Sequence, residues 1–376
     1  MSTHNEQFKP DYIVSPGEVL EETLEARGIK KRDFADRCGR TPKMISEILS
    51  GKAPITPETA LQFERVLGVS ARLWSNLEST YRLRLAEKEE AGELRRHSKT
   101  STLFPVKDLL KLGYIQKTED SGDMLGQLLK FFGVGKVESL ESCIDAQKTY
   151  YRGSQSFQSN QYSVAAWLRC GQIKAESIDT KPYDDDRFKA ALKEIRALTT
   201  EDIETALPKA VGLCADAGVA LVFVPGLKDT RLSGAARWLS KDKAAIQLSL
   251  RHGSNDHLWF TFFHEAGHIL LHGKKDLFLD DDDKSGDDME READHFAQNI
   301  LIPKDAWKDF TIKWADFPVN IIQDFANEQE IAPGIIVARL QFQEGLLPPS
   351  AKKQNALKVW YKWDESGTRI VTKTAD

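Results

Sequence analysis

Residues 264–268 read His-Glu-Ala-Gly-His and lie within a long hydrophobic stretch. A helix would place His264 and His268 four residues apart on one face, where both imidazoles can reach a single metal ion. Glu265 would project beside them toward water at that ion. Zinc lowers the pKa of such a water, and the carboxylate of Glu265 can accept its proton and later deliver it to a leaving amine. The pattern therefore predicts a Zn²⁺ site with hydrolytic chemistry.

A catalytic zinc needs a third protein ligand and an open fourth position. Residues 290–294 read Glu-Arg-Glu-Ala-Asp, and on a helix Glu290 and Asp294 share a face. Glu290 can complete a His₂Glu ligand set, while Asp294 can accept a hydrogen bond from a ligand histidine and fix its tautomer. Glu292 is the alternative third ligand, because spacing alone does not choose between the two glutamates. The competing interpretation is an ordinary buried helix with satisfied core histidines, packed beside a solvated acidic helix.

A second constellation lies near the N-terminus, where two short helical patterns are joined by Gly39-Arg40-Thr41. This size and this turn glycine are typical of a helix-turn-helix, whose later helix enters the major groove of DNA. The residues expected to face base edges are Thr41, Lys43, Met44, Ser46 and Glu47, and those better suited to phosphates are Lys30, Lys31, Arg32, Arg40 and Lys52. A small helical bundle that binds protein instead of DNA is the alternative.

The helices and strands that must position these residues can be predicted from the spacing of apolar residues and from the glycines and prolines between them. Residues 16–81 predict five short helices, most of them ended by glycine, and residues 83–97 predict an exposed helical connector. Residues 103–198 indicate further helices, interrupted by a polar loop at 150–161. Beyond residue 207 we expect one strand at 219–224, a hairpin of strands at 234–239 and 244–250, and helices at 257–271, 289–301, 318–329 and 333–341.

Charge is distributed unevenly along the 376-residue chain, whose formal net charge is -5. Residues 27–52 hold eight Lys or Arg against three acids, whereas residues 276–294 hold ten acids against two bases. The acidic run lacks the spacing of an EF-hand, so we interpret it as a solvated loop near the cleft, where it could restrict access. The two ends of the chain should therefore prefer different partners.

Cysteine usage and hydropathy indicate an intracellular protein. The four cysteines lie far apart without a CxxC pair, so we expect reduced thiols. No apolar run is long enough to span a bilayer, and residues 1–12 lack the apolar stretch of a secretory signal. We therefore expect a cytoplasmic location and no membrane partner.

Both ends of the chain resemble known families. Residues 16–81, with PGEVLEETLEARGI, ISEILSGKAPIT and LGVSARLWSNLESTY, look like the HigA antitoxin branch of the Cro/repressor-type helix-turn-helix family. Residues 207–303, with SGAARWL, AAIQLSL, FTFFHEAGHILLHG and EREADHFAQNILIP, resemble the ImmA/IrrE metallo-endopeptidases. The recognition helix lacks an obvious Gln or Asn pair for adenine, which leaves the operator sequence open.

Periodicity and the resemblance together predict an α+β, mainly α chain with four parts. The resemblance implies a HigA-like DNA-binding domain at 1–82 and a minimal gluzincin peptidase domain at 206–345 with a small β-sheet; the residue pattern adds a helical middle region at 83–205 and a tail at 346–376. The resemblance also implies that His264 and His268 bind zinc, that Glu265 is the catalytic acid/base and that a glutamate of EREAD is the third ligand. The implied function is a transcriptional regulator or antitoxin that cleaves a regulatory protein, either a partner or itself. Implied partners are a palindromic operator, a second copy in a homodimer, and a toxin. The alternative is a non-catalytic repressor or antitoxin with a structural or sensory zinc site.

Overall fold

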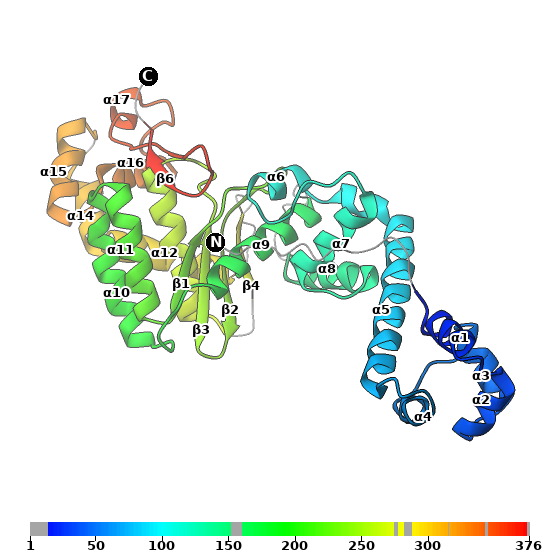
Figure 1. Ribbon diagram of the computed structural model, residues 1–376. Helices are drawn as coiled ribbons and strands as arrows, with labels where there is room; N and C mark the ends of the chain where they lie inside the picture. Colours follow the sequence, from blue (N-terminus) through cyan, green and yellow to red (C-terminus); the bar gives the residue numbers. More distant parts are fainter. Residues whose placement is uncertain are drawn as a thin grey trace. The chain divides into compact units, whose positions relative to one another are not determined.

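The computed structural model describes residues 14–151, 160–273, 277–281, 288–314, 316–342 and 345–373. Contacts divide these residues into two compact units, one ending at residue 97 and including 121–123, the other comprising the remaining residues from 98 onward. Helices predominate, and the strands form one four-stranded sheet and one small hairpin (Figure 1). The predicted α+β, mainly α class is confirmed.

The N-terminal unit consists of helices α1 (Pro16–Ala26), α2 (Lys31–Cys38), α3 (Pro42–Leu49), α4 (Pro57–Leu67) and α5 (Ala71–Arg96). Their starts follow from capping: the side chains of Ser15, Thr41 and Thr56 each accept a backbone N–H, and proline follows in the first turn. Gly39 adopts a left-handed conformation (φ 64°), which ends α2 and turns the chain into α3.

The expected fifth helix and the expected connector form one continuous helix, α5, of 26 residues. No glycine, proline or capping residue interrupts the chain between Tyr81 and Leu83, so nothing ends the helix there. The core of this unit is aromatic. The ring of Phe63 lies 5.0 Å from that of Phe34 and meets Trp74 edge-on at 5.7 Å.

The second unit begins with helical segments, as the sequence predicts for this region. Residues 152–159 of the expected polar loop lie outside the described residues. In α10 (Asp185–Ala197), Phe188, Leu192 and Ile195 belong to the same hydrophobic core as the helix that carries the HEAGH motif. The segments are η1 (Ser98–Leu103), α6 (Val106–Lys111), α7 (Ser121–Phe132), α8 (Val137–Tyr151), α9 (Gln161–Glu176), α10 (Asp185–Ala197), η2 (Leu198–Thr200) and α11 (Ile203–Asp216).

The four-stranded sheet has the order β1-β3-β2-β4. Its strands are β1 (Val219–Phe223), β2 (Leu232–Ser240), β3 (Lys243–Leu248) and β4 (Leu277–Asp281). β1 runs parallel to β3, whereas β2 pairs antiparallel with both β3 and β4. The predicted strand and hairpin are therefore confirmed.

The strand β4 corrects two expectations. Part of the acidic segment is not a loop but pairs with β2 from Leu277 to Asp281; residues 282–287 lie outside the described residues. β4 also occupies the outer side of β2, so the strand pair at 233–250 is internal. The sequence also favours an extended substrate held by edge pairing with this strand pair. That interpretation is wrong, because β1 and β4 already occupy the outer edges of β3 and β2.

Helices cover both faces of the sheet (Figure 1). On one face α9 packs through Ala175 against Ala220, Val222 and Ala245. On the other lies α12 (Asn255–Leu271), which carries the HEAGH motif and contacts α13 (Asp288–Leu301). Gly267 makes that approach close, since a Cβ there would lie only 3.2 Å from the Cα of Ala293.

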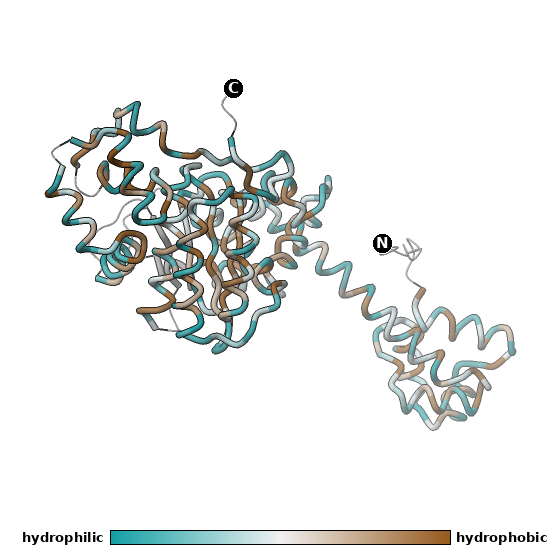
Figure 2. Tube along the Cα trace, turned by 90° about the vertical axis from the view of Figure 1, so that its left-hand side faces the viewer, coloured by the Kyte–Doolittle hydropathy of each residue, from teal (hydrophilic) through white to brown (hydrophobic). Residues whose placement is uncertain are grey.

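Helices α14 (Lys304–Lys313), α15 (Val319–Gln329) and α16 (Pro333–Phe342) follow, and the four helices predicted after the hairpin are all present. The described residues after 344 form α17 (Lys352–Asn355) and the hairpin of β5 (Tyr361–Trp363) and β6 (Ile370–Thr372). Leu347, Tyr361 and Ile370 belong to the main hydrophobic core. Figure 2 shows hydrophilic residues interspersed along the long helix α5. None of the described helices is both long enough and hydrophobic enough to cross a membrane.

Candidate metal centre and helix-turn-helix

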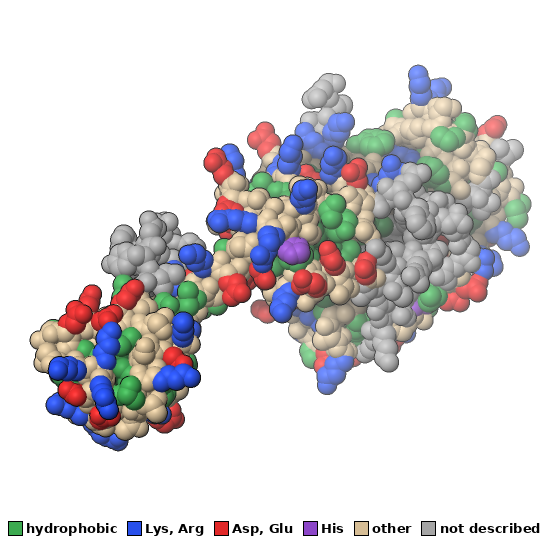
Figure 3. Space-filling view, turned by 90° about the vertical axis from the view of Figure 1, so that its right-hand side faces the viewer, with side chains coloured by type: hydrophobic (Ala, Val, Ile, Leu, Met, Phe, Trp, Pro, Cys, Tyr) green, Lys and Arg blue, Asp and Glu red, His purple; other side chains and the backbone are tan. Residues whose placement is uncertain are grey.

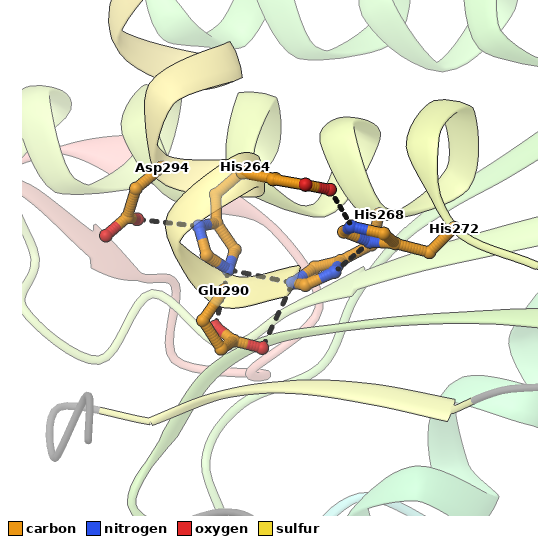
Figure 4. A network of polar contacts seen from close by, with 6 residues as sticks. His264, His268, His272, Glu290 and Asp294 are labelled. Atoms are coloured by element: carbon orange, nitrogen blue, oxygen red, sulfur yellow. Dashed lines mark hydrogen bonds and ion pairs between the residues drawn. The ribbon is translucent and has the colours of Figure 1, made fainter. Parts of the chain in front are cut away.

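Helix α12 brings His264, Glu265 and His268 into the interior of the second unit, where each is 0% exposed. The four-residue spacing places both imidazoles on one face, as predicted, and their Nε2 atoms lie 3.0 Å apart (Figure 4). Two nitrogen donors from adjacent turns thus point toward one position.

Helix α13 adds a carboxylate to this pair. Oε2 of Glu290 lies 3.1 Å from Nε2 of His264, and Oε1 lies 3.3 Å from Nε2 of His268. Donor atoms of all three residues fall within 4.8 Å of one another. Zinc bonds of about 2.0–2.1 Å in a tetrahedron separate neighbouring ligand atoms by about 3.3 Å. The donor types and their spacing therefore fit one zinc ion.

The alternative third ligand lies elsewhere. The side chain of Glu292 is 63% exposed, and its Oε2 lies 3.3 Å from Nε2 of His272. Glu290 and Glu292 point in different directions because two residues on a helix are about 200° apart. Only Glu290 of this pair is brought to the two histidines.

Each histidine of the cluster has a partner at its other ring nitrogen (Figure 4). Nδ1 of His264 lies 2.9 Å from Oδ1 of Asp294, the contact expected from the sequence. Nδ1 of His268 lies 2.9 Å from Nδ1 of His272. Such contacts fix the tautomer and ring orientation of a metal-binding histidine. The position of His272, four residues after His268, predicts a residue that supports a ligand histidine or is partly exposed, and that does not itself bind the metal. The structure places it against His268.

The protonation states suit metal binding. Burial lowers the pKa of His268, which favours the neutral imidazole that a metal requires. Burial by itself would raise the pKa of Glu290, but the side-chain hydrogen bonds to His264 and His268 outweigh it and hold the pKa below its ordinary value. The carboxylate is therefore charged at neutral pH, with its negative charge directed at the two imidazoles.

The position of Glu265 depends on β2, a feature missed from the sequence. A Cβ on Gly234 would lie 2.5 Å from Oε1 of Glu265 and 2.7 Å from Cγ2 of Thr261. Only a residue without a side chain lets this strand pass so close to the glutamate. The glycine of SGAARWL was the available signal, but nothing local in the sequence indicates what it faces.

In the N-terminal unit, α2, the turn at Gly39 and α3 form the predicted helix-turn-helix. Lys43, Ser46 and Lys52 are exposed, whereas Met44 and Glu47 are half-buried. Figure 3 shows basic and acidic side chains together on one face of this bundle. The described surface thus offers basic groups, several of them next to acids.

Two of the expected DNA contacts also stabilise the bundle itself. Thr41 caps α3 by accepting the N–H of Met44 at 3.2 Å. Arg40 donates from Nε to Oε1 of Gln62 on α4 at 2.6 Å. Lys43 lies 3.9 Å from Glu47 in an exposed pair one turn apart, a separation at which attraction is weak.

Comparison with known proteins matches both the N-terminal unit and the region around the metal centre to protein families. Residues 20–74 match the helix-turn-helix family, and residues 235–314 match the IrrE N-terminal-like domain. The uncharacterized HTH-type transcriptional regulator YddM of Escherichia coli K12 is 37% identical over 82 residues, which cover 22% of this chain and 87% of that protein.

Two solved structures of antitoxins are each similar to less than a quarter of this chain. An addiction module antidote protein of a HigA family from Coxiella burnetii is 26% identical, covering 22% of this chain and 92% of that one, with a TM-score of 0.21. The Pseudomonas aeruginosa antitoxin HigA with the higBA promoter is 24% identical, covering 23% and 94%, with a TM-score of 0.22. The two family matches and the similarity to YddM show that the chain belongs to the helix-turn-helix family of transcriptional regulators and carries an IrrE N-terminal-like domain in its C-terminal half.

Proposed function

We propose that this protein is a DNA-binding transcriptional regulator or antitoxin whose C-terminal domain is a zinc-dependent endopeptidase. The substrate is a regulatory protein, either a partner or another copy of this chain. The observation that carries the proposal is the buried cluster of His264, His268 and Glu290, with Glu265 on the same helix as the histidines. An ordinary packing role would not require two imidazoles and a carboxylate to direct donor atoms at one position.

In this proposal His264, His268 and Glu290 hold the zinc ion. When bound, zinc supplies Lewis-acid chemistry that polarises a peptide carbonyl and makes water acidic. Asp294 and His272 keep the imidazoles oriented through their Nδ1 atoms. Glu265, confined by Gly234 and Thr261, accepts a proton from the attacking water and passes it to the amine that leaves.

The experiment measures zinc content and peptide-bond hydrolysis in the same samples. Purified full-length protein is compared with Glu265→Gln, using the products of the neighbouring genes and the chain itself as substrates. We expect one zinc per chain in both proteins and loss of cleavage in the variant alone, since Glu265 is not a ligand. Wild-type cleavage by Glu265→Gln would exclude this mechanism. Zinc binding with regulation unchanged in Glu265→Gln would favour the non-catalytic alternative, in which zinc is structural or sensory.

For the N-terminal unit we propose operator binding by α3, as a homodimer on a palindromic site, with a toxin as a further partner. A DNA-bound regulator acts where the chromosome lies, which is the basis for proposing a cytoplasmic location. The support is the family match together with the exposed basic groups of the bundle.

Gel shifts with the chain's own promoter test this assignment. Lys43→Ala should weaken binding and relax specificity at one base position, because Lys43 is expected to face a base edge in the groove. Lys193→Ala, an exposed lysine on α10 in the other unit, is the matched control and should change neither quantity. Equal binding by Lys43→Ala and the wild-type chain would count against the groove assignment.

A further inference from the structure

The carboxylate of Glu292 is remote from the metal position but lies at the end of a series of contacts that leads to it. Its Oε2 lies 3.3 Å from Nε2 of His272. Nδ1 of His272 lies 2.9 Å from Nδ1 of His268, whose Nε2 faces Glu290 at 3.3 Å (Figure 4). The side chains are 0% exposed at His268, 5% at His272 and 63% at Glu292. The series therefore joins the buried metal position to the protein surface.

The contact between the two imidazoles can hold only one proton. A neutral imidazole has one N–H group that donates and one unprotonated nitrogen that accepts. Because His268 and His272 face each other through their Nδ1 atoms, one of these atoms must donate and the other must accept. The pair therefore has two possible arrangements, and the tautomer of one ring fixes the tautomer of the other.

The carboxylate of Glu292 selects one of these arrangements. An ionised carboxylate only accepts hydrogen bonds, so Nε2 of His272 has to be the donor in their contact. Nδ1 of His272 then carries no proton and accepts from Nδ1 of His268. The Nε2 atom of His268 is left unprotonated, which is the form that a metal ion binds. In the opposite arrangement a proton would occupy that Nε2 atom and exclude the metal.

Helix α13 makes the same choice for the other histidine without an intermediate residue. Oδ1 of Asp294 lies 2.9 Å from Nδ1 of His264, so this Nδ1 donates and the Nε2 atom of His264 is unprotonated. Glu290 faces the Nε2 atoms of both histidines. Three acids of one helix thus have separate roles, and Glu292 reaches its histidine through His272.

We propose that Glu292 is a positioning residue for the metal centre, which holds His268 in its metal-binding tautomer by accepting the Nε2–H of His272. This inference rests on the proposed zinc site and identifies how one of its ligands is prepared. Zinc affinity should therefore depend on whether the side chain at position 292 accepts or donates a hydrogen bond. An acceptor keeps the required tautomer, a side chain that does neither leaves both tautomers open, and a donor selects the tautomer that excludes zinc.

The test measures zinc affinity of the full-length protein by chelator competition. Position 292 is exposed enough to accept all three substitutions without loss of the fold. Glu292→Gln, whose amide oxygen can still accept, should stay within about threefold of the wild-type affinity. Glu292→Ala should bind zinc about three- to tenfold more weakly, and Glu292→Lys at least about tenfold more weakly.

Asp288→Lys is the matched control for charge. It makes the same change of charge at an exposed acid of α13, one helical turn before Glu292. The carboxylate of Asp288 pairs with Arg291. The zinc affinity of Asp288→Lys should stay within about threefold of the wild-type value, because an exposed charge at this distance is screened by solvent.

A double-mutant cycle shows whether Glu292 acts through His272. In the His272→Ala background the route to His268 is absent, so Glu292→Lys should lower zinc affinity by no more than about twofold. A direct effect of charge on the metal would persist in that background.

A spectroscopic measurement identifies the tautomer itself. The imidazole nitrogens of His272 are assigned in ¹⁵N spectra of the zinc-loaded protein by their loss in His272→Ala. At about pH 8, where an ordinary imidazole is neutral, Nε2 of His272 should carry the proton and Nδ1 should carry none.

Wild-type zinc affinity in Glu292→Lys would overturn the inference and leave the zinc site standing. An equal loss of affinity in Asp288→Lys, or in Glu292→Lys with and without His272, would also overturn it, and so would a proton on Nδ1 of His272. Absence of zinc binding by the wild-type protein would overturn the proposed function and this inference together.

Discussion

Gly234→Ala should displace the side chain of Glu265, because the added methyl group would overlap with it. The added Cβ would lie 2.5 Å from Oε1 and 2.9 Å from Cγ of Glu265, and 2.7 Å from Cγ2 of Thr261. Carbon atoms in contact are normally about 3.5–4.0 Å apart, so some group must move by about 1 Å. Gly234 pairs with Leu248 on one side and Asp280 on the other, which restrains the strand. Glu265 should therefore be the group that moves.

Two magnitudes follow from this geometry. Overpacking of a rigid interior costs about 1–3 kcal/mol of unfolding free energy. A displacement of about 1 Å at a catalytic group costs roughly a hundredfold in rate. Zinc affinity should be nearly unchanged, because Gly234 approaches Glu265 and none of the three proposed ligands.

A double-mutant cycle measures the effect without requiring turnover. Stability is measured by calorimetry on the full chain, following the transition that zinc shifts upward, since zinc stabilises only the unit that binds it. Glu265→Ala removes two of the three close contacts, so we expect a coupling of at least about 1 kcal/mol between positions 234 and 265. Thr261→Ser removes the third contact and should restore more of the loss.

Gly226→Ala is the matched control. Its added Cβ would approach only the carbonyl oxygen of Thr230, at 3.9 Å. Such a substitution should be neutral or stabilising by about 0.4–1 kcal/mol. Additive costs for Gly234→Ala and Glu265→Ala, with no coupling, would refute the argument that this glycine makes room for the glutamate.

Three further predictions concern other parts of the second unit. His272→Ala should weaken zinc binding about ten- to a hundredfold in a chelator competition, because it removes the group that orients a ligand imidazole, and unchanged affinity would contradict this. Lys358→Met should lower the free energy of unfolding by about 3–5 kcal/mol, since it leaves the 1%-exposed carboxylate of Asp256 without its cation; a loss below about 1 kcal/mol in denaturant titrations would exclude this role. The pKa of Asp364 is lowered to about 2, mainly because its carboxylate accepts a hydrogen bond from the backbone N–H of Arg369. The ionised carboxylate of Asp364 therefore stabilises the fold above the unfolded pKa of about 4, and this stabilisation is lost as the pH falls toward 2. Carboxyl NMR titration checks this, and a pKa near 4 for Asp364 would rule it out.

Many of the helices and strands could be predicted from the sequence because they depend on interactions between residues close together in the chain. Helix starts at Ser15, Thr41 and Thr56 depend on capping and proline within one turn, so the bundle could be predicted residue by residue. The pairing of His264 and His268 depends only on helical periodicity, and for that reason HEAGH predicted a shared face. The hairpin followed from alternating apolar segments around a polar turn. The joining of two expected helices into α5 was missed because helix continuation gives no positive signal.

Tertiary contacts decided the rest. Glu290 rather than Glu292 lies beside the histidines because α13 packs against α12 at a fixed rotation, with Ala293 against Gly267. The strand β4 is stabilised by pairing with β2, and its acidic sequence does not by itself predict a strand. Contacts between residues far apart in the chain depend on how whole elements pack, and that information is not contained in any local window of the sequence.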